Sequence, residues 1–181
     1  MTTIRPYNDK DFEMMFAAFN ARVEWLVSKG LEDQWGAEPW GDDIRNKVIK
    51  SIPEEDAKGA KRWVAEVDGE SVGWLVMTPF RSDYIPVTDQ DKPGNEAFLK
   101  TLLVKPGFSG RGIGEKLLEV AKQYAREEKA EWLRLDCYRG PAGKDGLVKY
   151  YESKGFTKAR AFAVPGRKGK EWTGQLLEMA V

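Results

Sequence analysis

Four glycines fall within eight positions in the segment KPGFSGRGIGEKLL, residues 105–118, and a helix-like pattern follows at once. Glycine at this density marks backbone that takes left-handed φ values or that a ligand must approach closely. A helix beginning here presents unpaired N–H groups and the positive end of its dipole. We therefore expect this loop to bind an anion such as a phosphate group, the alternative being a tight turn without a ligand.

Apolar periodicity predicts an alternation of strands and helices around this loop. Residues at spacings of three and four between Phe12 and Val27 predict a helix that ends at Gly30, and GDDIRNKVIKSI, 41–52, predicts a shorter one capped by Asp42 or Asp43. The other expected elements are strands at 3–7, 61–67, 71–78, 96–104, 132–138, 156–164 and 172–181, and helices after the glycine loop and at 145–154.

The element order β-α-α-β-β-β-α-β-α-β-β predicts one α/β domain over residues 1–181, with a mixed central sheet of about seven strands flanked by helices. Residues 79–95, PFRSDYIPVTDQDKPGN, form a Pro- and Asp-rich connection that is long for such a domain. Loops of this length are often functional.

Composition excludes several classes of function. The 29 basic residues balance 29 acidic ones, which argues against nucleic acid or an anionic membrane as partner, and the basic run GRKGK, 166–170, is typical of a solvated hairpin turn. The chain has no histidine and one cysteine, Cys137, so a His-based catalytic triad, a His- or Cys-rich metal site and an internal disulfide are excluded. No signal peptide or membrane-spanning run is evident, so we expect a cytoplasmic protein. Because histidine is absent and cysteine occurs once, we also expect no metal.

The glycine loop fails two common phosphate-binding patterns. A Walker loop requires Lys after its last glycine, whereas Gly114 is followed by Glu115, and a dinucleotide-binding fingerprint requires glycine at 115. The loop instead follows V-x-P-x-x-x-G-R-G-x-G between a strand and a helix, and YYESKGF, 150–156, lies about forty residues downstream. These two motifs, in this order, resemble those of the GNAT N-acetyltransferase superfamily, and the likeness in element order extends over nearly the whole chain.

This resemblance implies an acetyl-CoA site built mainly from backbone N–H groups. The cofactor-binding residues that it implies are Leu102, Leu103, Val104, Ser109, Gly110, Arg111, Gly112, Ile113, Gly114 and Glu115. Ser109 stands where the family usually has Gln or Arg, and Lys144 and Leu147 replace the family's usual Asn and Ala ahead of the second motif. The segment 102–104 would also supply N–H groups to the thioester oxygen.

Acetyl transfer to an amine also needs a group that protonates the leaving sulfur and a group that takes the amine proton. Tyr151 occupies the family's tyrosine position, so the resemblance implies that it acts as the acid, the alternative being an aromatic anchor. The family's usual base positions hold Phe98 and Lys100, which leaves Glu96 or Asp136 as the base. Either carboxylate could equally be a solvated or salt-bridged residue at the end of a strand.

The acceptor side is expected in GLEDQWGAEPWGDD, 30–43, which holds five acids and no Lys or Arg. Trp35, Glu38 and Trp40 would suit a cationic amine through aromatic faces and charge, or the segment is a polar connection pinned by two tryptophans. The sequence therefore predicts direct acetyl transfer, in a ternary complex, from acetyl-CoA to a small cationic amine. A protein or peptide acceptor, a non-catalytic acyl-CoA-binding module and a homodimeric state remain alternatives.

Overall fold

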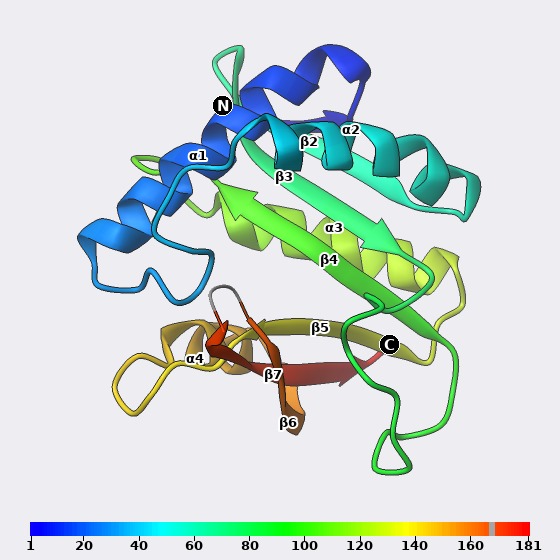
Figure 1. Ribbon diagram of the computed structural model, residues 1–181. Helices are drawn as coiled ribbons and strands as arrows, with labels where there is room; N and C mark the ends of the chain where they lie inside the picture. The colour runs from blue at the N-terminus through cyan, green and yellow to red at the C-terminus, as the bar shows by residue number, and fades with distance from the viewer. Residues whose placement is uncertain (167–168) are drawn as a thin grey trace.

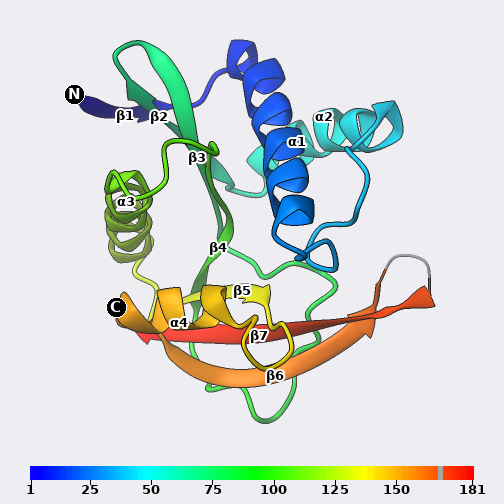
Figure 2. The same ribbon diagram turned by 90° about the vertical axis from the view of Figure 1, so that its left-hand side faces the viewer.

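The computed structural model describes residues 1–166 and 169–181, in one twisted sheet with helices on both faces (Figures 1 and 2). Arg167 and Lys168, in the turn expected at 166–170, lie outside the described residues. The strands are β1 (Thr2–Pro6), β2 (Lys61–Val67), β3 (Glu70–Thr78), β4 (Glu96–Val104), β5 (Trp132–Tyr138), β6 (Thr157–Pro165) and β7 (Glu171–Ala180). The helices are α1 (Phe12–Ser28), α2 (Asp42–Ala57), α3 (Ile113–Glu127) and α4 (Gly146–Ser153), with a 3-10 turn, η1 (Asp9–Asp11), before α1.

The strands form one mixed sheet in the order β1-β2-β3-β4-β5-β7-β6. Only β4 and β5 are parallel among these neighbours in the described chain, and α3 connects them. The predicted α/β fold class and element order are confirmed, and β4 and β5 have the predicted bounds. The connection at 79–95 contains turns but no helix or strand.

Side chains that alternate along the strands divide the core into layers. Ala97 and Leu99 of β4 point toward the cluster that α3 and α4 cover, because strand neighbours face opposite sides of a sheet. Phe98 points the other way and packs with Ile85 of the 79–95 loop. The helices α1 and α2 lie on this second side (Figure 2), where α1 packs on β2, β3 and β4. The long loop is therefore part of the structure of that face.

The second helix differs from its prediction. Gly41, in extended conformation, takes the N-cap position, and Asp42 and Asp43 lie in the first turn, where their charges complement the helix dipole. The helix also continues through Pro53 and ends at Ala57, five residues beyond its predicted end at residue 52. Proline removes a helix hydrogen bond, but the helix packs an apolar stripe against the α1 cluster, formed by Ile44, Val48 and Ile52. Tertiary packing thus overrides the local stop signal.

No helix within the described ranges combines the length and the apolar character that crossing a membrane would require.

Close packing of α3 on the sheet depends on Gly73 of β3. A methyl group there would lie 3.1 Å from side-chain atoms of Ile113 and Leu117. We expect Gly73→Ala to lower the free energy of unfolding by about 1–3 kcal/mol, as overpacked core positions do, measured by urea denaturation. Gly146→Ala is the control, because a Cβ there meets nothing within 4 Å, and its stability should equal or slightly exceed that of the parent. Equal stability of both variants would contradict the close approach.

Candidate active site

The strands β4 and β5 separate halfway along their length, which opens the sheet. Within the described residues their ladder runs from Glu96 opposite Trp132 to Leu99 opposite Leu135 and goes no further. Beyond this point β4 continues beside β3, and β5 continues beside β7, so the two diverge (Figure 1). The ladder to β3 also shifts register at this point, leaving Lys100 as the extra residue of a bulge. The β5-facing backbone N–H groups of 101–104 are therefore outside the ladder and can pair with a ligand.

The glycine loop lies directly after β4, and its backbone conformation explains why it is rich in glycine. Gly107, Gly110 and Gly112 have left-handed φ values of 90°, 79° and 73°, which other residues rarely adopt. A Cβ at any of the three would meet nothing within 4 Å, so this side of the loop is open. The backbone of α3 begins its ladder with Lys116 N–H donating to Gly112 O at 3.1 Å. The N–H groups of 113–115 thus have no acceptor within the helix and can hold an anion.

Tyr150, rather than Tyr151, lies closest to this loop. A Cβ on Gly114 would lie 3.0 Å from the Tyr150 hydroxyl oxygen and 3.8 and 3.9 Å from side-chain atoms of Leu102 and Val104. The predicted cofactor segments at 102–104 and 110–115 therefore come together in space, with a phenol that the motif comparison did not identify. The sequence pointed to Tyr150 only through its position next to Tyr151. Successive residues on a helix point in different directions, so this adjacency did not show which hydroxyl reaches the loop.

Two further expected cofactor residues have side chains engaged elsewhere. Glu115 pairs with Lys154, the residue after α4, and that ammonium group holds the pKa of the carboxyl below its usual value. Leu103 is buried in the cluster beneath α1, so only its backbone can serve the opening. The guanidinium of Arg22 on α1 donates to the Val104 carbonyl and links this helix to the end of β4. Arg22 is a residue that the sequence analysis missed, because nothing in the pattern of α1 distinguishes it.

Tyr151 is buried in the core cluster that α3 and α4 cover. Its ring makes edge contacts with Tyr150 and Phe156, at centroid distances of 5.1 and 5.8 Å. Burial raises the pKa of this phenol, and the neighbouring Cys137, Tyr150 and Asp136 raise it further. Tyr151 therefore keeps its proton at neutral pH and can donate a hydrogen bond, but the raised pKa makes it a weaker acid than an exposed tyrosine and excludes it as a resting base.

Asp136 follows Leu135, the last residue of β5 that pairs with β4. Its carboxylate accepts a hydrogen bond of 2.7 Å from the Tyr84 hydroxyl of the 79–95 loop. Burial raises the pKa of Asp136 to about 6, although the Tyr84 hydrogen bond opposes the rise. A carboxylate whose pKa is raised toward neutrality at an opening of the sheet is a candidate for a general base.

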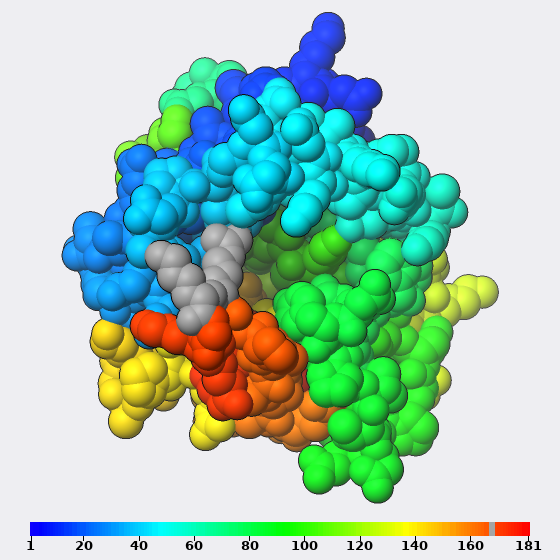
Figure 3. Space-filling model, in the orientation of Figure 1, coloured from blue at the N-terminus to red at the C-terminus, as the bar shows by residue number. Residues whose placement is uncertain are grey.

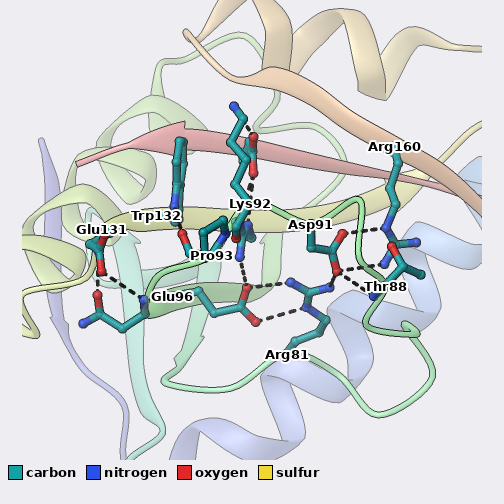
Figure 4. A network of polar contacts seen from close by, with 12 residues as sticks. Arg81, Thr88, Asp91, Lys92, Pro93, Glu96, Glu131, Trp132 and Arg160 are labelled. Atoms are coloured by element: carbon teal, nitrogen blue, oxygen red, sulfur yellow. Dashed lines mark hydrogen bonds and ion pairs between the residues drawn. The ribbon is translucent and has the colours of Figure 1, made fainter.

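Glu96, the other candidate base, lies at the closed end of the ladder. It accepts hydrogen bonds from Arg81 and Arg134 at 2.7 Å each (Figure 4). Burial acts to raise the pKa of Glu96, but the two guanidinium groups outweigh it and hold the pKa below its usual value. It pairs with Trp132, four residues before Asp136, which corresponds to about 13 Å along the strand. The structure does not bring Glu96 to the opening and favours the salt-bridged alternative for it.

The acidic segment 30–43 is held mainly by packing. The rings of Trp35 and Trp40 pack against the Phe19 ring, at centroid distances of 5.4 and 5.0 Å. The two tryptophan rings also contact each other, at a centroid distance of 5.7 Å. Asp33 pairs with Lys170 at 3.1 Å, a neutralising contact that the local sequence does not reveal. Glu38 is exposed. These contacts favour the alternative in which the segment is a polar connection held in place by its two tryptophans. The segment meets the residues around the opening through Trp172, whose Nε1 donates to Gln34 O at 3.1 Å.

Aromatic side chains gather beside Asp136. The Trp172 ring lies 6.2 Å from Tyr84, and 6.0 Å from both Tyr138 and Phe162. Figure 3 shows the surface hollowed between α2, the 79–95 loop and β6, with β4 at the bottom. Sequence analysis identified the long loop but not Tyr84, because no local pattern indicates which loop residue reaches β5.

Known proteins share this fold, and a known family matches most of this sequence. A sequence model of the acetyltransferase (GNAT) family matches residues 20–156. An uncharacterized N-acetyltransferase of Archaeoglobus fulgidus is 33% identical over 115 residues, 61% of this chain and 71% of the relative. The solved ribosomal-protein-alanine N-acetyltransferase of Brucella melitensis has a TM-score of 0.71 at 21% identity, over 99% of each chain. The structure of yncA from Salmonella typhimurium with its cofactor acetyl-CoA has a TM-score of 0.68 at 17% identity, over 99% of this chain and 93% of its own.

The glycine loop can be tested with a pair of isosteric variants. Gly112→Asp and Gly112→Asn impose nearly the same shape and backbone strain, but only the first places a negative charge at the start of α3. We expect Gly112→Asp to bind CoA at least about tenfold more weakly than Gly112→Asn, because a carboxylate repels a phosphate at a helix N-terminus. Isothermal titration calorimetry on both folded variants measures this difference. Equal affinities would place the phosphates elsewhere.

Proposed function

The chain belongs to the acetyltransferase (GNAT) family and is an acyltransferase; we propose that it moves an acetyl group from acetyl-CoA to the primary amine of a small cationic molecule, by direct attack in a ternary complex. The observation that carries this proposal is the opening between β4 and β5. The glycine loop lies at one side of it, and Asp136 faces the other side. Donor and acceptor can therefore approach the same gap from opposite faces of the sheet.

The donor side fits acetyl-CoA. The open face of Gly107, Gly110 and Gly112 and the unpaired N–H groups of 113–115 suit a pyrophosphate, while Leu102 and Val104 suit an apolar arm. Bound acetyl-CoA would supply an activated acetyl group as a thioester. The free backbone N–H groups of β4 beside the gap would stabilise negative charge on the thioester oxygen.

Asp136 and Tyr151 divide the proton transfers between them. Asp136, with a pKa of about 6, is ionised at neutral pH and can accept the amine proton as the new C–N bond forms. An ammonium group with a pKa of about 10.4 must first lose one proton to expose its lone pair, which costs about 4–5 kcal/mol at pH 7. The neutral amine then attacks, and its remaining proton becomes acidic enough to pass to Asp136 as the C–N bond forms. Tyr151 would donate a hydrogen bond to the departing sulfur and pass its proton to it only as negative charge develops there, because burial raises the pKa of the phenol and opposes an earlier transfer.

The surroundings of Asp136 favour a cationic acceptor. Its carboxylate supplies negative charge, and the rings of Tyr84 and Trp172 are adjacent faces that attract cations. Trp35, Glu38 and Trp40 take a secondary part in this proposal, because the segment reaches the opening through the contact between Gln34 and Trp172. The aromatic group beside Asp136 replaces the acidic segment as the main recognition surface.

A thiol-release assay with acetyl-CoA and a panel of acceptors tests the function. The panel holds polyamine-like cations, neutral amines, amino acids and a peptide with an N-terminal alanine, the last because one structural neighbour is named for a protein alanine substrate. We expect the highest kcat/KM with a small cation. A preference for the peptide would overturn the small-molecule proposal, and thiol release with none of the acceptors would overturn the amine class.

Replacing the proposed base should separate activity from stability. We expect Asp136→Asn to lower kcat/KM by about 10²–10⁴-fold with little change in acetyl-CoA affinity, and the parent enzyme to lose activity as pH falls through about 6. Steady-state kinetics over pH measure both effects. Full activity in the Asn variant would remove Asp136 from the mechanism.

The same substitution should stabilise the fold at neutral pH. The folded state binds the Asp136 proton more tightly than the unfolded chain does, since its pKa rises from 3.8 to about 6. Ionising Asp136 therefore destabilises the folded state by up to about 3 kcal/mol. The whole of this penalty applies above pH 6, and none of it applies well below the ordinary pKa of 3.8. Asp136→Asn should raise the free energy of unfolding at neutral pH, and the difference should vanish near pH 4. A destabilised variant at neutral pH would contradict the raised pKa.

The two adjacent tyrosines of α4 should have different roles. We expect Tyr151→Phe to lower kcat by about 10- to 100-fold, because it removes the proton donor, with little change in the KM for acetyl-CoA. Tyr150→Phe is the matched control and should alter mainly the KM for acetyl-CoA, since its hydroxyl lies over Gly114. Equal kcat in both variants, with chemistry shown to limit turnover, would reduce Tyr151 to an aromatic anchor.

A further inference from the structure

We propose that the 79–95 loop is a positioning device for the reaction, in which Asp91, held by Arg81 and Arg160, fixes Tyr84 against Asp136. This inference rests on the proposed function, because it assigns Asp136 as the base. Tyr84 comes from a segment without helix or strand, yet its hydroxyl meets a carboxylate 52 positions further along the chain. Such a contact needs an anchor within the loop.

Asp91 supplies the first anchor. Its two carboxylate oxygens accept from Arg81 Nη1 and Arg160 Nε at 2.6 Å each, and Thr88 N–H donates to it at 3.2 Å (Figure 4). The side chains of Asp91, Arg81 and Arg160 are only 6%, 6% and 8% exposed, so solvent screens these charges weakly. Arg160 belongs to β6, and Arg81 also pairs with Glu96 of β4. The loop is thereby bound to two strands of the sheet.

The second anchor flanks Tyr84 itself. Ile85 is buried among Phe98, Phe162 and Leu176, and the Pro86 carbonyl accepts a hydrogen bond from Arg160. The two residues after Tyr84 are therefore fixed by an apolar contact and by the same arginine that binds Asp91. Tyr84, although half exposed, has little freedom to leave Asp136 while Arg160 holds the loop.

Tyr84 acts on Asp136 in two opposite ways. Burial raises the pKa of Asp136, an effect to which the Tyr84 ring would contribute by excluding water, and the Tyr84 hydroxyl donates to the carboxylate, which lowers the pKa. Burial and the Asp136 charge raise the pKa of Tyr84, so the phenol stays protonated and remains a donor. The other titratable groups that interact with Asp136 are Cys137 of β5 and Tyr151 of α4, while β7 places the apolar Leu176 opposite it.

The test is a titration of the Asp136 carboxyl by carbon-13 NMR in the parent and in variants of the full chain. Tyr84→Phe keeps the ring and removes the hydrogen bond, so the pKa of Asp136 should rise by about one unit. Asp91→Asn should release the loop and admit water, so that the pKa falls from about 6 toward 3.8. Asp89→Asn, two positions away on the exposed part of the loop, removes the same charge and should leave the pKa nearly unchanged.

Asp91→Asn takes the carboxylate from the buried Arg160 and leaves Arg81 with Glu96 alone, so the variant can fail to fold, and Arg160→Lys is the second loop variant. Arg160→Lys keeps the positive charge but loses the planar guanidinium that binds both Asp91 and the Pro86 carbonyl. The pKa of Asp136 should therefore fall, as in Asp91→Asn. An unchanged titration in Tyr84→Phe and in the folded loop variant would overturn the inference. If Asp136 shifts as expected and the acid limb of kcat/KM does not follow, the positioning holds and the assignment of Asp136 as base fails.

Discussion

The end of hydrogen bonding between β4 and β5 after Leu99 and Leu135 is the constraint on which the rest of the structure depends. A sheet that stayed paired would use its own backbone groups and leave none for a ligand. Because the two strands part, β4 carries its free N–H groups toward the glycine loop, and β5 carries Asp136 to the opposite face. In the proposed function, this one interruption in the ladder creates both the donor side and the acceptor side.

The closed end of the same ladder is held by charge. Glu96 of β4, Arg134 of β5 and Glu178 of β7 form a connected set of ion pairs in which the last two side chains are 3% and 2% exposed. Such groups lose hydration on burial and stabilise the fold only while every partner is present, and removing one partner of such a pair typically costs about 3–5 kcal/mol. This network lies where the strands still pair, so the opening begins next to a rigid end.

The fold and the position of the glycine loop were predicted well from the sequence, because both depend on local signals. Strand alternation, helical periodicity and glycines at left-handed φ are readable within a few residues, and β4 and the loop with Gly112 lie where they were expected. The end of α2 was wrong, because the packing of its apolar face outweighs Pro53.

The acceptor side depends on contacts between distant residues, and here local patterns were insufficient. Asp33 and the other acids of 30–43 form a negative segment in sequence, but Lys170 meets Asp33 only in the folded chain. Glu96 and Asp136 are equivalent as strand-end acids until the ladder shows that only Asp136 lies beyond its end. Tyr84 could not be selected from its loop, because the anchors that place it are on other strands.

The most direct test of this account is a crystal structure with a bisubstrate analogue, in which an acetyl linker joins CoA to a small cationic amine. The account predicts that the pyrophosphate lies on the N–H groups of 113–115 and that the linker passes between β4 and β5. It also predicts that the amine nitrogen lies within hydrogen-bonding reach of Asp136, directly or through one water. A linker that stays on the α3 face, or an amine that approaches the sheet away from Asp136, would contradict the central claim that both substrates meet in this opening.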